Sequence, residues 1–364
     1  MNILHIIPTL GVGGTERQLV NLLPRIDRVR FRQTVCFYTP SETLETPLRE
    51  AGIPVIFFDK FSMSAWSFFR RMRRVIHEVG PDVIHTWLYS ANFWGRLAGI
   101  SCGVRRLVAS NRSMAIPTSS PVVLYERILA PYTTRLANSR AVAASLERRY
   151  GLPAAGIKVI YNAVDPPAIP PANARAAVRA ELGLPEGQML ILMAGRQTPE
   201  KNHAMFLRAA RRVGRRRSDV TFVVLGHLFR PGEMHALVDT MEAALYVRIV
   251  NQREDMPRWL AASDIFCLTS NAEGLPNVVL EAMATGLPVV CTDFESAREV
   301  IPDDRTGVIV PRDDDAALAA AVLTLLADAE RRRSLGAAAR EYVRVHFGWD
   351  RLVRDMESLY DGLA

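Results

Sequence analysis

Short apolar segments alternate with longer amphipathic ones along this chain, and the alternation starts twice. The first series extends from residues 3–7 to residues 107–109, and the second from residues 189–193 to residues 289–292. Such an order predicts strands that pair in a parallel sheet and helices that cover its faces. Between the two series, residues 166–171 contain four prolines, which exclude both a helix interior and a central strand. The sequence therefore predicts two doubly wound α/β domains joined by a linker.

The length of 364 residues suits two domains of ordinary size. We expect an N-terminal domain over residues 1–165, a C-terminal domain over residues 166–345 and a closing helical segment over residues 346–364. Apolar residues make up 49% of the chain and charged residues 23%, so packed cores are expected and disorder is not.

Charge is distributed unevenly between the two halves. Lys and Arg outnumber Asp and Glu in residues 1–165, whereas acidic residues slightly outnumber basic ones in the remainder. A basic half indicates an anionic partner, which is a membrane surface, a phosphate-bearing substrate or nucleic acid; the alternative is a solvated arginine-rich surface. Neither zinc-finger spacing nor the aromatic and basic pattern of single-strand binding occurs, so no nucleic acid partner is expected.

Cysteine usage and hydropathy indicate a cytoplasmic location. The four cysteines stand singly in apolar stretches, which is typical of core residues in a reducing compartment. No apolar run reaches the roughly 18 residues that span a bilayer, and no basic leader opens the chain. Residues 66–76 set aromatic side chains against four arginines, which indicates either peripheral contact with an anionic membrane or a core-facing helix with a solvated basic side.

Residues 273–281 follow an apolar strand and open a helix, so they form a strand-to-helix turn of the kind where doubly wound sheets bind ligands. Backbone N–H groups around residues 275–279 are expected to point at a pyrophosphate, because Pro276 suits the first helical turn. Carboxylates repel phosphates, so we assign Glu273 to hydroxyls of a donor sugar and Glu281 to a ribose. The alternative is a loop charge and an ordinary helix-surface residue.

Residues 194–202 form a second strand-to-helix turn. The turn carries Arg196 and Lys201, two cations at the carboxyl edge of the predicted sheet that suit a diphosphate leaving group. For either residue alone, a cation on a solvated loop is the ordinary alternative.

The glycines at positions 11, 13 and 14 follow the first strand and permit close backbone approach where the first helix begins. Their spacing fails the GxGxxG pattern, so a nicotinamide dinucleotide site is not expected.

Strand ends of the first domain supply further polar candidates. His85 is expected at the end of a strand, followed by a polar and aromatic loop over residues 86–92 that faces a cleft. Residues 111–113, with Arg112, and residues 138–140 hold analogous positions. A strand-end histidine is more often a hydrogen-bonded structural residue than a catalyst.

These loops, in this order, resemble family 4 of the glycosyltransferases, which are retaining enzymes of the GT-B fold. The similarity extends over nearly the whole chain, and its most specific part is the pair of glutamates in EGLPNVVLEAMATGLPVV, from residue 273. The other matching motifs are Gly13, Gly14 and Glu16, residues 82–85, residues 137–139, residues 159–165, and Gly195 and Arg196 with Lys201 and Asn202.

The resemblance implies two facing Rossmann-like domains, with the acceptor in the first and a nucleotide sugar in the second. It also implies a last helix, from about residue 349, that crosses back to the first domain. Arg196 and Lys201 would stabilise the leaving diphosphate, and no bound metal or other cofactor is implied, because two cations and a helix N-terminus take that role. Retention in the family is attributed to front-face attack assisted by the leaving phosphate, so Glu273 is not assigned as a nucleophile.

The resemblance and the loop positions together give one set of expected site residues. The expected catalytic residues are Arg196, Lys201, Glu273 and His85. The expected donor-binding residues are Gly13, Gly14, Gly195, Gly274, Leu275, Pro276, Asn277, Val278, Glu281 and Arg253. The residues expected on the acceptor side are Glu16, Trp87, Asn92 and Arg112.

The chain departs from the family pattern at three places. Many members have a second histidine two positions after the first, but here Thr86 and Trp87 follow His85. This departure leaves open whether His85 contacts the sugar. A common double glycine is replaced at positions 295 and 296, on the acceptor side. The glycine usual near residues 250–253, in a loop close to the base, is missing, which leaves the base open.

The expected reaction is the transfer of a sugar from a UDP- or GDP-linked donor, with retention, to a hydroxyl group. The expected acceptor is a growing surface polysaccharide, a lipopolysaccharide or a lipid-linked glycan. Two alternatives stay open: a sugar-nucleotide epimerase of the same fold and a non-catalytic nucleotide-sugar-binding protein.

Overall fold

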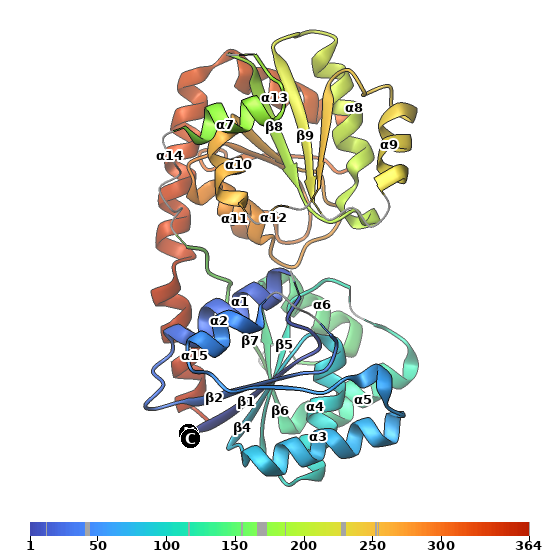
Figure 1. Ribbon diagram of the computed structural model, residues 1–364, viewed down its shortest axis with the longest axis vertical. Helices are drawn as coiled ribbons and strands as arrows, with labels where there is room; N and C mark the ends of the chain where they lie inside the picture. The colour runs from blue at the N-terminus through green and yellow to red at the C-terminus, as the bar shows by residue number, and fades with distance from the viewer. Residues whose placement is uncertain are drawn as a thin grey trace. The chain divides into compact units, whose positions relative to one another are not determined.

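The computed structural model describes residues 1–11, 13–40, 44–115, 117–153, 156–165, 173–185, 187–226, 231–251, 253 and 255–363. The chain forms two compact units (Figure 1). The first unit consists of Met1–Ala163 together with Trp349–Ala364, and the second consists of Val164–Gly348. The proline-rich linker predicted at residues 166–171 lies outside the described residues.

The first unit contains a seven-stranded parallel sheet in the order β3-β2-β1-β4-β5-β6-β7. The strand order changes direction between β1 and β4, which is the switch point of a doubly wound sheet. The strands are β1 (Asn2–Ile7), β2 (Arg32–Phe37), β3 (Val55–Phe57), β4 (Val83–Trp87), β5 (Arg106–Asn111), β6 (Thr133–Ala137) and β7 (Ile157–Val159).

Helices cover both faces of this sheet, because consecutive strand residues point to opposite faces and both sets are apolar. Helices α1 and α15 share one core with Ile3 and Val83, whereas α3 and α4 share another with Leu4 and Ile84. The helices of this unit are α1 (Gly14–Leu22), α2 (Glu45–Glu50), α3 (Ala65–Val79), α4 (Tyr89–Ser101), α5 (Ser120–Leu129), α6 (Arg140–Tyr150) and α15 (Trp349–Asp361).

The second unit contains a six-stranded parallel sheet in the order β10-β9-β8-β11-β12-β13. Helices α8 and α13 share a core with one face of this sheet, α7 packs on α10, and α11 packs on α14. The strands are β8 (Met189–Ala194), β9 (Val220–Gly226), β10 (Val247–Asn251), β11 (Ile265–Leu268), β12 (Val289–Thr292) and β13 (Val308–Val310). The helices are α7 (Ala174–Glu181), α8 (His203–Gly214), α9 (Pro231–Thr240), α10 (Met256–Ala262), α11 (Asn277–Ala284), α12 (Ala297–Val300), α13 (Asp315–Ala327) and α14 (Ala329–His346).

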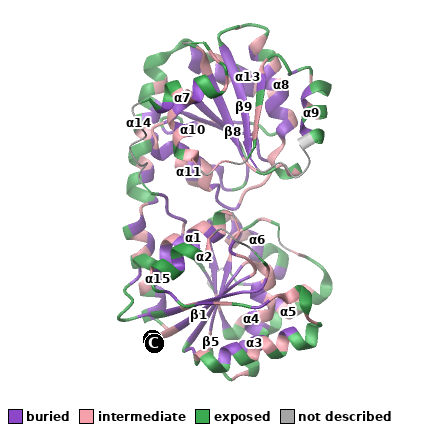
Figure 2. Ribbon diagram, in the orientation of Figure 1, coloured by how far each residue is buried: buried purple, intermediate pink, exposed green. Residues whose placement is uncertain are grey.

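The central strands are the most deeply buried part of each unit, as Figure 2 shows. In β9 every residue is buried, and in β8 every residue after Met189 is buried. This burial explains why the strands appear in the sequence as unbroken apolar runs instead of alternating patterns.

The two doubly wound parallel units predicted from the sequence are confirmed, but the short strands β7 and β13 were not predicted, and β6 was expected only through the polar residues 138–140 that follow it. Strand β6 contains Arg135, whose charge is buried and paired with Glu126 of α5, so its sequence does not resemble an apolar run. Strands β7 and β13 have only three residues each. Among the described residues, no helix is both long enough and apolar enough to cross a membrane.

Candidate functional site

Two loops of the second unit meet at the carboxyl edge of its sheet. Strands β8 and β11 are neighbours, so the loops that follow them begin side by side. The Nζ atom of Lys201 lies 2.5 Å from Oε1 of Glu273, although the two residues are 72 positions apart. Their side chains are only 18% and 14% exposed. The fold therefore brings two of the expected catalytic residues into direct contact.

Local backbone geometry positions Lys201. Asn202 has a left-handed conformation, with φ of 47°, and its side chain caps α8 by accepting a hydrogen bond from the Met205 N–H. The Thr269 hydroxyl, which follows β11, donates to the carbonyls of Lys201 and Asn202 at 3.0 Å. A Cβ on Gly195 would lie 3.3 Å from the Lys201 side chain, so this glycine lets the side chain pass closely.

Glu273 is held by two serines that were not among the expected site residues. Its Oε1 accepts a hydrogen bond from the Ser270 hydroxyl at 2.6 Å, in addition to the Lys201 contact. Its backbone carbonyl accepts a hydrogen bond from the Ser296 hydroxyl at 3.2 Å. Strand β11 ends at Leu268, and Thr269 and Ser270 follow it. Polar residues at this place in a strand-to-helix turn were the sequence signal that could have identified Ser270 as a site residue.

Helix α11 begins at the expected turn. Its first residue is Asn277, and Pro276 is the N-cap, one position before the predicted first turn. The N-cap residue Pro276 makes no side-chain hydrogen bond to the helix, and the N-terminus of a helix favours anions. Gly274, Leu275 and Pro276 are buried; Val278, on the first turn, and Glu281, one turn later, are half-buried.

The remaining expected cations of the second unit have different surroundings. Arg196 is exposed in the loop after β8. Arg253 contacts Asp255 at 3.0 Å and Glu181 at 3.2 Å, and its guanidinium lies over the Trp259 ring. The hydrogen bond from Arg253 holds the pKa of Asp255 at about 2. Among the described residues, the recorded contacts of Arg253 are therefore with Asp255, Glu181 and Trp259, and none is with Lys201 or Glu273.

In the first unit, the glycine loop leads into α1. Gly13 is the N-cap of α1 and Gly14 its first residue. The Glu16 carboxylate folds back against Gly13, where a Cβ atom would overlap it. Glu16 is only 8% exposed, so its charge is held close to the carboxyl edge of the sheet.

Arg112, directly after β5, lies near Glu16. Its guanidinium is 5.1 Å from the centre of the Trp87 ring and donates a hydrogen bond to the Asn162 side chain. Burial lowers the pKa of Arg112 to about 10, and the Glu16 carboxylate opposes that shift. The structure thus brings three of the four residues expected on the acceptor side into one cluster.

The prediction that a loop begins after His85 is wrong. Strand β4 continues to Trp87, so His85 lies inside the strand and is fully buried. Its Nδ1 is 2.8 Å from the Tyr360 hydroxyl of α15, and its Nε2 is 2.8 Å from the Ser110 hydroxyl. Burial lowers the pKa of His85 well below its usual value, so the ring is neutral. Both ring nitrogens are engaged inside the first unit.

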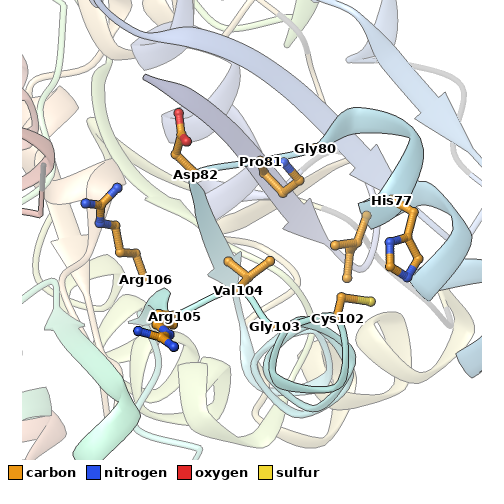
Figure 3. A pocket seen from close by; sticks show the side chains of 10 residues that line it. His77, Gly80, Pro81, Asp82, Cys102, Gly103, Val104, Arg105 and Arg106 are labelled. Atoms are coloured by element: carbon orange, nitrogen blue, oxygen red, sulfur yellow. The ribbon is translucent and has the colours of Figure 1, made fainter.

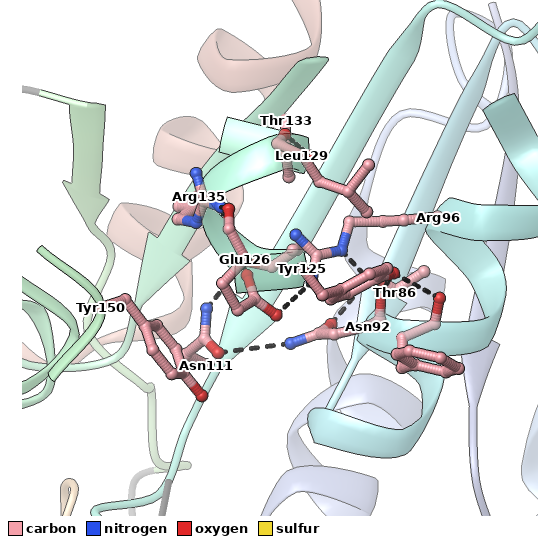
Figure 4. Close-up of polar contacts among 12 residues, drawn as sticks. Thr86, Asn92, Arg96, Asn111, Tyr125, Glu126, Leu129, Thr133, Arg135 and Tyr150 are labelled. Carbon is pink, nitrogen blue, oxygen red and sulfur yellow. Dashed lines mark hydrogen bonds and ion pairs between the residues drawn. The ribbon is translucent and has the colours of Figure 1, made fainter. Parts of the chain in front are cut away.

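Trp87 and Asn92 are likewise interior residues, not members of an exposed loop. Trp87 stacks on His85 with 4.4 Å between the ring centres, and its Nε1 donates to Nδ1 of His5. Asn92 lies in α4, where its side chain bonds to Thr86 at 2.8 Å and to the Ser110 carbonyl at 3.1 Å (Figure 4). The sequence pattern failed here because an aromatic and polar run is compatible with either a loop or a buried strand end.

A pocket of about 440 Å³ lies at the opposite edge of the first sheet (Figure 3). It is lined by residues at the amino ends of β4 and β5, among them Asp82 and Arg105. The Asp82 carboxylate accepts a hydrogen bond from the Asn2 N–H at 2.7 Å, which ties the sheet edge together. Ligands of doubly wound sheets bind at the carboxyl edge, so this pocket is not the candidate site. Within the described part of the chain, no three His, Cys, Asp or Glu side chains are grouped to hold a metal ion.

Comparison with known proteins identifies the family of the chain. The family described as glycosyl transferases group 1 matches residues 174–342, and glycosyltransferase family 4 matches residues 12–167. A D-inositol 3-phosphate glycosyltransferase of Xylanimonas cellulosilytica is 33% identical over 302 residues, which cover 77% of this chain and 71% of that protein.

Two further similarities extend over most or all of the chain. A Campylobacter jejuni protein is 24% identical over 90% of this chain and 91% of its own length. Its name is N-acetylgalactosamine-N,N'-diacetylbacillosaminyl-diphospho-undecaprenol 4-alpha-N-acetylgalactosaminyltransferase. The crystal structure of Anabaena HepE in complex with UDP and glucose superposes with a TM-score of 0.88, at 21% identity and with 100% of both chains covered. The matched families, the 33% identical relative and the shared two-sheet architecture lead to one conclusion: the chain belongs to the group 1, or family 4, glycosyltransferases and has the GT-B fold.

Proposed function

We propose that this glycosyltransferase moves a sugar, with retention of its anomeric configuration, from a UDP- or GDP-linked donor to a hydroxyl of a surface polysaccharide, a lipopolysaccharide or a lipid-linked glycan. The observation that carries the proposal is the Lys201–Glu273 contact, which pairs a cation with a carboxylate at the carboxyl edge of the second sheet. The similar Anabaena structure contains UDP and glucose, and the Campylobacter relative is named for an undecaprenol-linked acceptor.

Lys201, Arg196 and the N-terminus of α11 receive the donor diphosphate. Cations and free helix N-termini stabilise the negative charge that develops on a leaving diphosphate, which is the main electrostatic demand of the reaction. Because these groups supply that positive charge, we assign no metal ion to the reaction.

Glu273 and Glu281 bind hydroxyl groups of the sugar and the ribose. A diphosphate at Lys201 competes with Glu273 for the ammonium group, which frees the carboxylate to accept hydrogen bonds from the sugar. Glu281 lies one turn into α11 and is half-buried, so its carboxylate is held near the same helix end.

The first domain holds the acceptor at the carboxyl edge of its own sheet. Glu16 and Arg112 are the charged groups there, and Trp87 and His85 form the buried layer beneath them. Since both nitrogens of His85 have partners inside the domain, we assign His85 a positioning role for Trp87 and Arg112 instead of a direct contact with the sugar.

Two measurements test the donor assignment. A thermal-shift panel of UDP- and GDP-sugars identifies the donor, because a ligand that binds only the folded chain raises its melting temperature. Release of nucleoside diphosphate is then measured for the wild type, Arg196→Ala and Lys201→Ala. Loss of either cation is expected to lower turnover about 100-fold or more, as for the loss of a group that stabilises transition-state charge.

The matched control is Arg305→Ala, because Arg305 is 87% exposed and paired only with the nearby Asp303 in its recorded ion pairs. Full turnover in the Arg196 and Lys201 variants would overturn the site assignment. Incubation with the donor alone separates transfer from epimerisation, since an epimerase yields an isomerised nucleotide sugar without any acceptor.

A cytoplasmic location with peripheral membrane contact through α3 completes the proposal. The apolar stripe of α3, including Phe68 and Met72, is buried in its own domain, whereas Trp66 is 64% exposed. Arg70 and Arg74 are exposed on the same helix. Trp66→Ser together with Arg70→Ser and Arg74→Ser is expected to reduce co-sedimentation with anionic liposomes, since each basic residue contributes about 1 kcal/mol near such a surface. Unchanged binding would remove the membrane contact from the proposal.

A further inference from the structure

Two buried polar atoms that have no hydrogen-bond partner among the described residues lie in neighbouring residues at the carboxyl edge of the first sheet. They are Nε of Arg112, which follows β5, and Oδ1 of Asn138, which follows β6. The two residues are in contact, because the Asn138 amide nitrogen donates to the Arg112 carbonyl at 3.4 Å. A buried donor and a buried acceptor therefore lack partners within a single cluster.

Neither side chain is free to turn toward another partner. The Nη2 atom of Arg112 is bonded to Asn162, and its guanidinium lies over Trp87. The amide nitrogen of Asn138 donates to the Arg112 carbonyl. The atom of the Asn138 amide that has no partner is therefore its oxygen, Oδ1.

The framework around this pair is itself buried and bonded. Asn162 is 3% exposed, and its carbonyl accepts a hydrogen bond from Arg351 of α15 at 2.8 Å. The next residue, Ala163, donates its N–H to the Gln18 side chain of α1 at 3.0 Å. Three segments distant in the sequence thus converge to hold Arg112 in one orientation.

A buried polar group without a partner costs about 1–3 kcal/mol, and more if it is charged. Two such groups in contacting residues at the ligand-binding edge of a doubly wound sheet point to a ligand that pairs with them. The ligand group must accept a hydrogen bond from the Arg112 Nε–H and donate one to the Asn138 oxygen. A hydroxyl does both with a single oxygen atom.

We propose that Arg112 and Asn138 together bind one hydroxyl group of the acceptor, and that the acceptor residue seated there is an uncharged sugar or polyol. The inference rests on the proposed transferase function and specifies its acceptor site. It makes Arg112 and Asn138 specificity-determining residues, with Arg112 as the donor of one hydrogen bond and Asn138 as the acceptor of the other.

A phosphate group fits the same position poorly. A phosphate dianion has no proton to donate to the Asn138 oxygen, and the Glu16 carboxylate, close enough to act on Arg112, would repel it. The site therefore discriminates against a phosphorylated acceptor ring at this position.

The test uses the full-length chain and a fixed panel of probes. The uncharged probes are the methyl α-glycosides of glucose, galactose and mannose, together with myo-inositol, and the charged probe is myo-inositol 1-phosphate. Saturation-transfer NMR titrations give a Kd for each probe with the wild type, Arg112→Met and Asn138→Leu. The control is Arg105→Met, an exposed arginine at the opposite edge of the same sheet.

At least one uncharged probe is expected to bind the wild type, and myo-inositol 1-phosphate is expected to bind more weakly than myo-inositol. For the bound probe, Arg112→Met raises Kd about tenfold or more and Asn138→Leu about three- to tenfold, as for a charged and a neutral hydrogen bond. Arg105→Met leaves Kd unchanged.

Failure of all uncharged probes to bind, tighter binding of the phosphate, or equal Kd values for wild type and variants would each overturn the inference. The melting-temperature shift given by UDP or GDP is measured on the same samples. An unchanged shift in the two variants shows that they are folded, and it separates failure of this inference from failure of the proposed donor site. If neither nucleotide shifts the wild type, the proposed function itself fails.

Discussion

At the scale of single residues, one carboxylate oxygen organises the candidate donor site. Oε1 of Glu273 accepts hydrogen bonds from Lys201 at 2.5 Å and from Ser270 at 2.6 Å. Hydrogen bonds to a charged group are stronger than neutral ones, so these two donors fix the carboxylate orientation. If Lys201 binds the donor diphosphate as proposed, Ser270 is the remaining donor of these two that keeps Glu273 in place.

Ser270→Ala is therefore expected to lower kcat/KM for the donor about tenfold, since a hydrogen bond to a charged group contributes about 1.5 kcal/mol or more. Donor turnover and the melting temperature are measured together, and only turnover is expected to change strongly. The control is Thr324→Ala, because the recorded bond of the exposed Thr324 hydroxyl lies within helix α13, to the Ala320 carbonyl. Equal turnover in Ser270→Ala and Thr324→Ala would exclude the positioning role of Ser270.

The buried histidines of the first unit predict a dependence of stability on pH. Burial lowers the pKa of His5 to about 3 and that of His85 well below 6.5. In the unfolded chain both rings bind protons near pH 6.5, whereas the folded chain keeps them neutral, so unfolding takes up protons. Stability is complete above pH 6.5 and falls as pH decreases toward the folded-state values, by up to about 1.4 kcal/mol per pH unit for each ring.

Denaturant unfolding at about pH 7.5 and about pH 5 measures this slope. His85→Gln is expected to reduce the loss of stability at the lower pH, because one buried titrating ring is removed. The control is His77→Gln, which replaces an exposed histidine of α3 in the same unit. Identical slopes for the wild type and His85→Gln would contradict the assignment.

At the scale of elements, a buried ion triad joins α4, α5 and β6 (Figure 4). Glu126 of α5 binds Arg96 of α4 and Arg135 of β6, and the three side chains are 6%, 1% and 5% exposed. Burial lowers the pKa of Arg135, and the Glu126 carboxylate opposes that shift. The triad therefore ties α5 to both α4 and β6.

Glu126→Gln is expected to lower the free energy of unfolding by about 3–5 kcal/mol, because two arginines are left buried with no opposite charge. Glu341→Gln is the matched control: its partner Arg344 lies three positions away on an exposed helix surface, where ion pairs contribute little. Denaturant titration of both variants checks the difference. Equal stability of the two variants would mean that the triad is not needed to hold α5.

At the scale of the whole molecule, the last helix completes a core that begins at the first residues of the chain. Trp349, Leu352, Met356, Leu359 and Tyr360 of α15 are all buried in the core that contains β1 and α1. Tyr360 also holds His85, which lies 275 positions earlier in the sequence. The first unit is therefore discontinuous in sequence and cannot form completely from residues 1–163.

Removal of residues 349–364 is expected to unfold the first unit while residues 164–348 stay folded. Burial of these five side chains is worth on the order of 10 kcal/mol, which is comparable to the whole stability of a domain, about 5–15 kcal/mol. Hydrogen exchange of the truncated chain measures this, with protection lost in β1–β7 and retained in β8–β13. Retained protection in both units would contradict the prediction. A peptide of residues 349–364 added in trans is expected to restore protection in the first unit.

The sequence by itself determined the two doubly wound units and the loops that carry the site. Apolar runs followed by amphipathic stretches are local signals, so the strands over 3–7, 189–193 and 289–292 were predictable from composition and period alone. The motif at residues 273–281 likewise predicts a strand-to-helix turn from local sequence alone. Local signals were weak at β6, where Arg135 interrupts the apolar run, and they failed after His85, where a buried strand end resembles a loop.

Only the tertiary structure decided which of these residues meet. The Lys201–Glu273 contact depends on β8 and β11 being neighbours, and the Arg112–Asn138–Asn162 cluster depends on the order of β5, β6 and β7. The bond of His85 to Tyr360 depends in addition on the return of α15 to the first sheet. Strand order and helix return are set by how two apolar faces are buried together, a long-range balance that no local stretch of sequence contains.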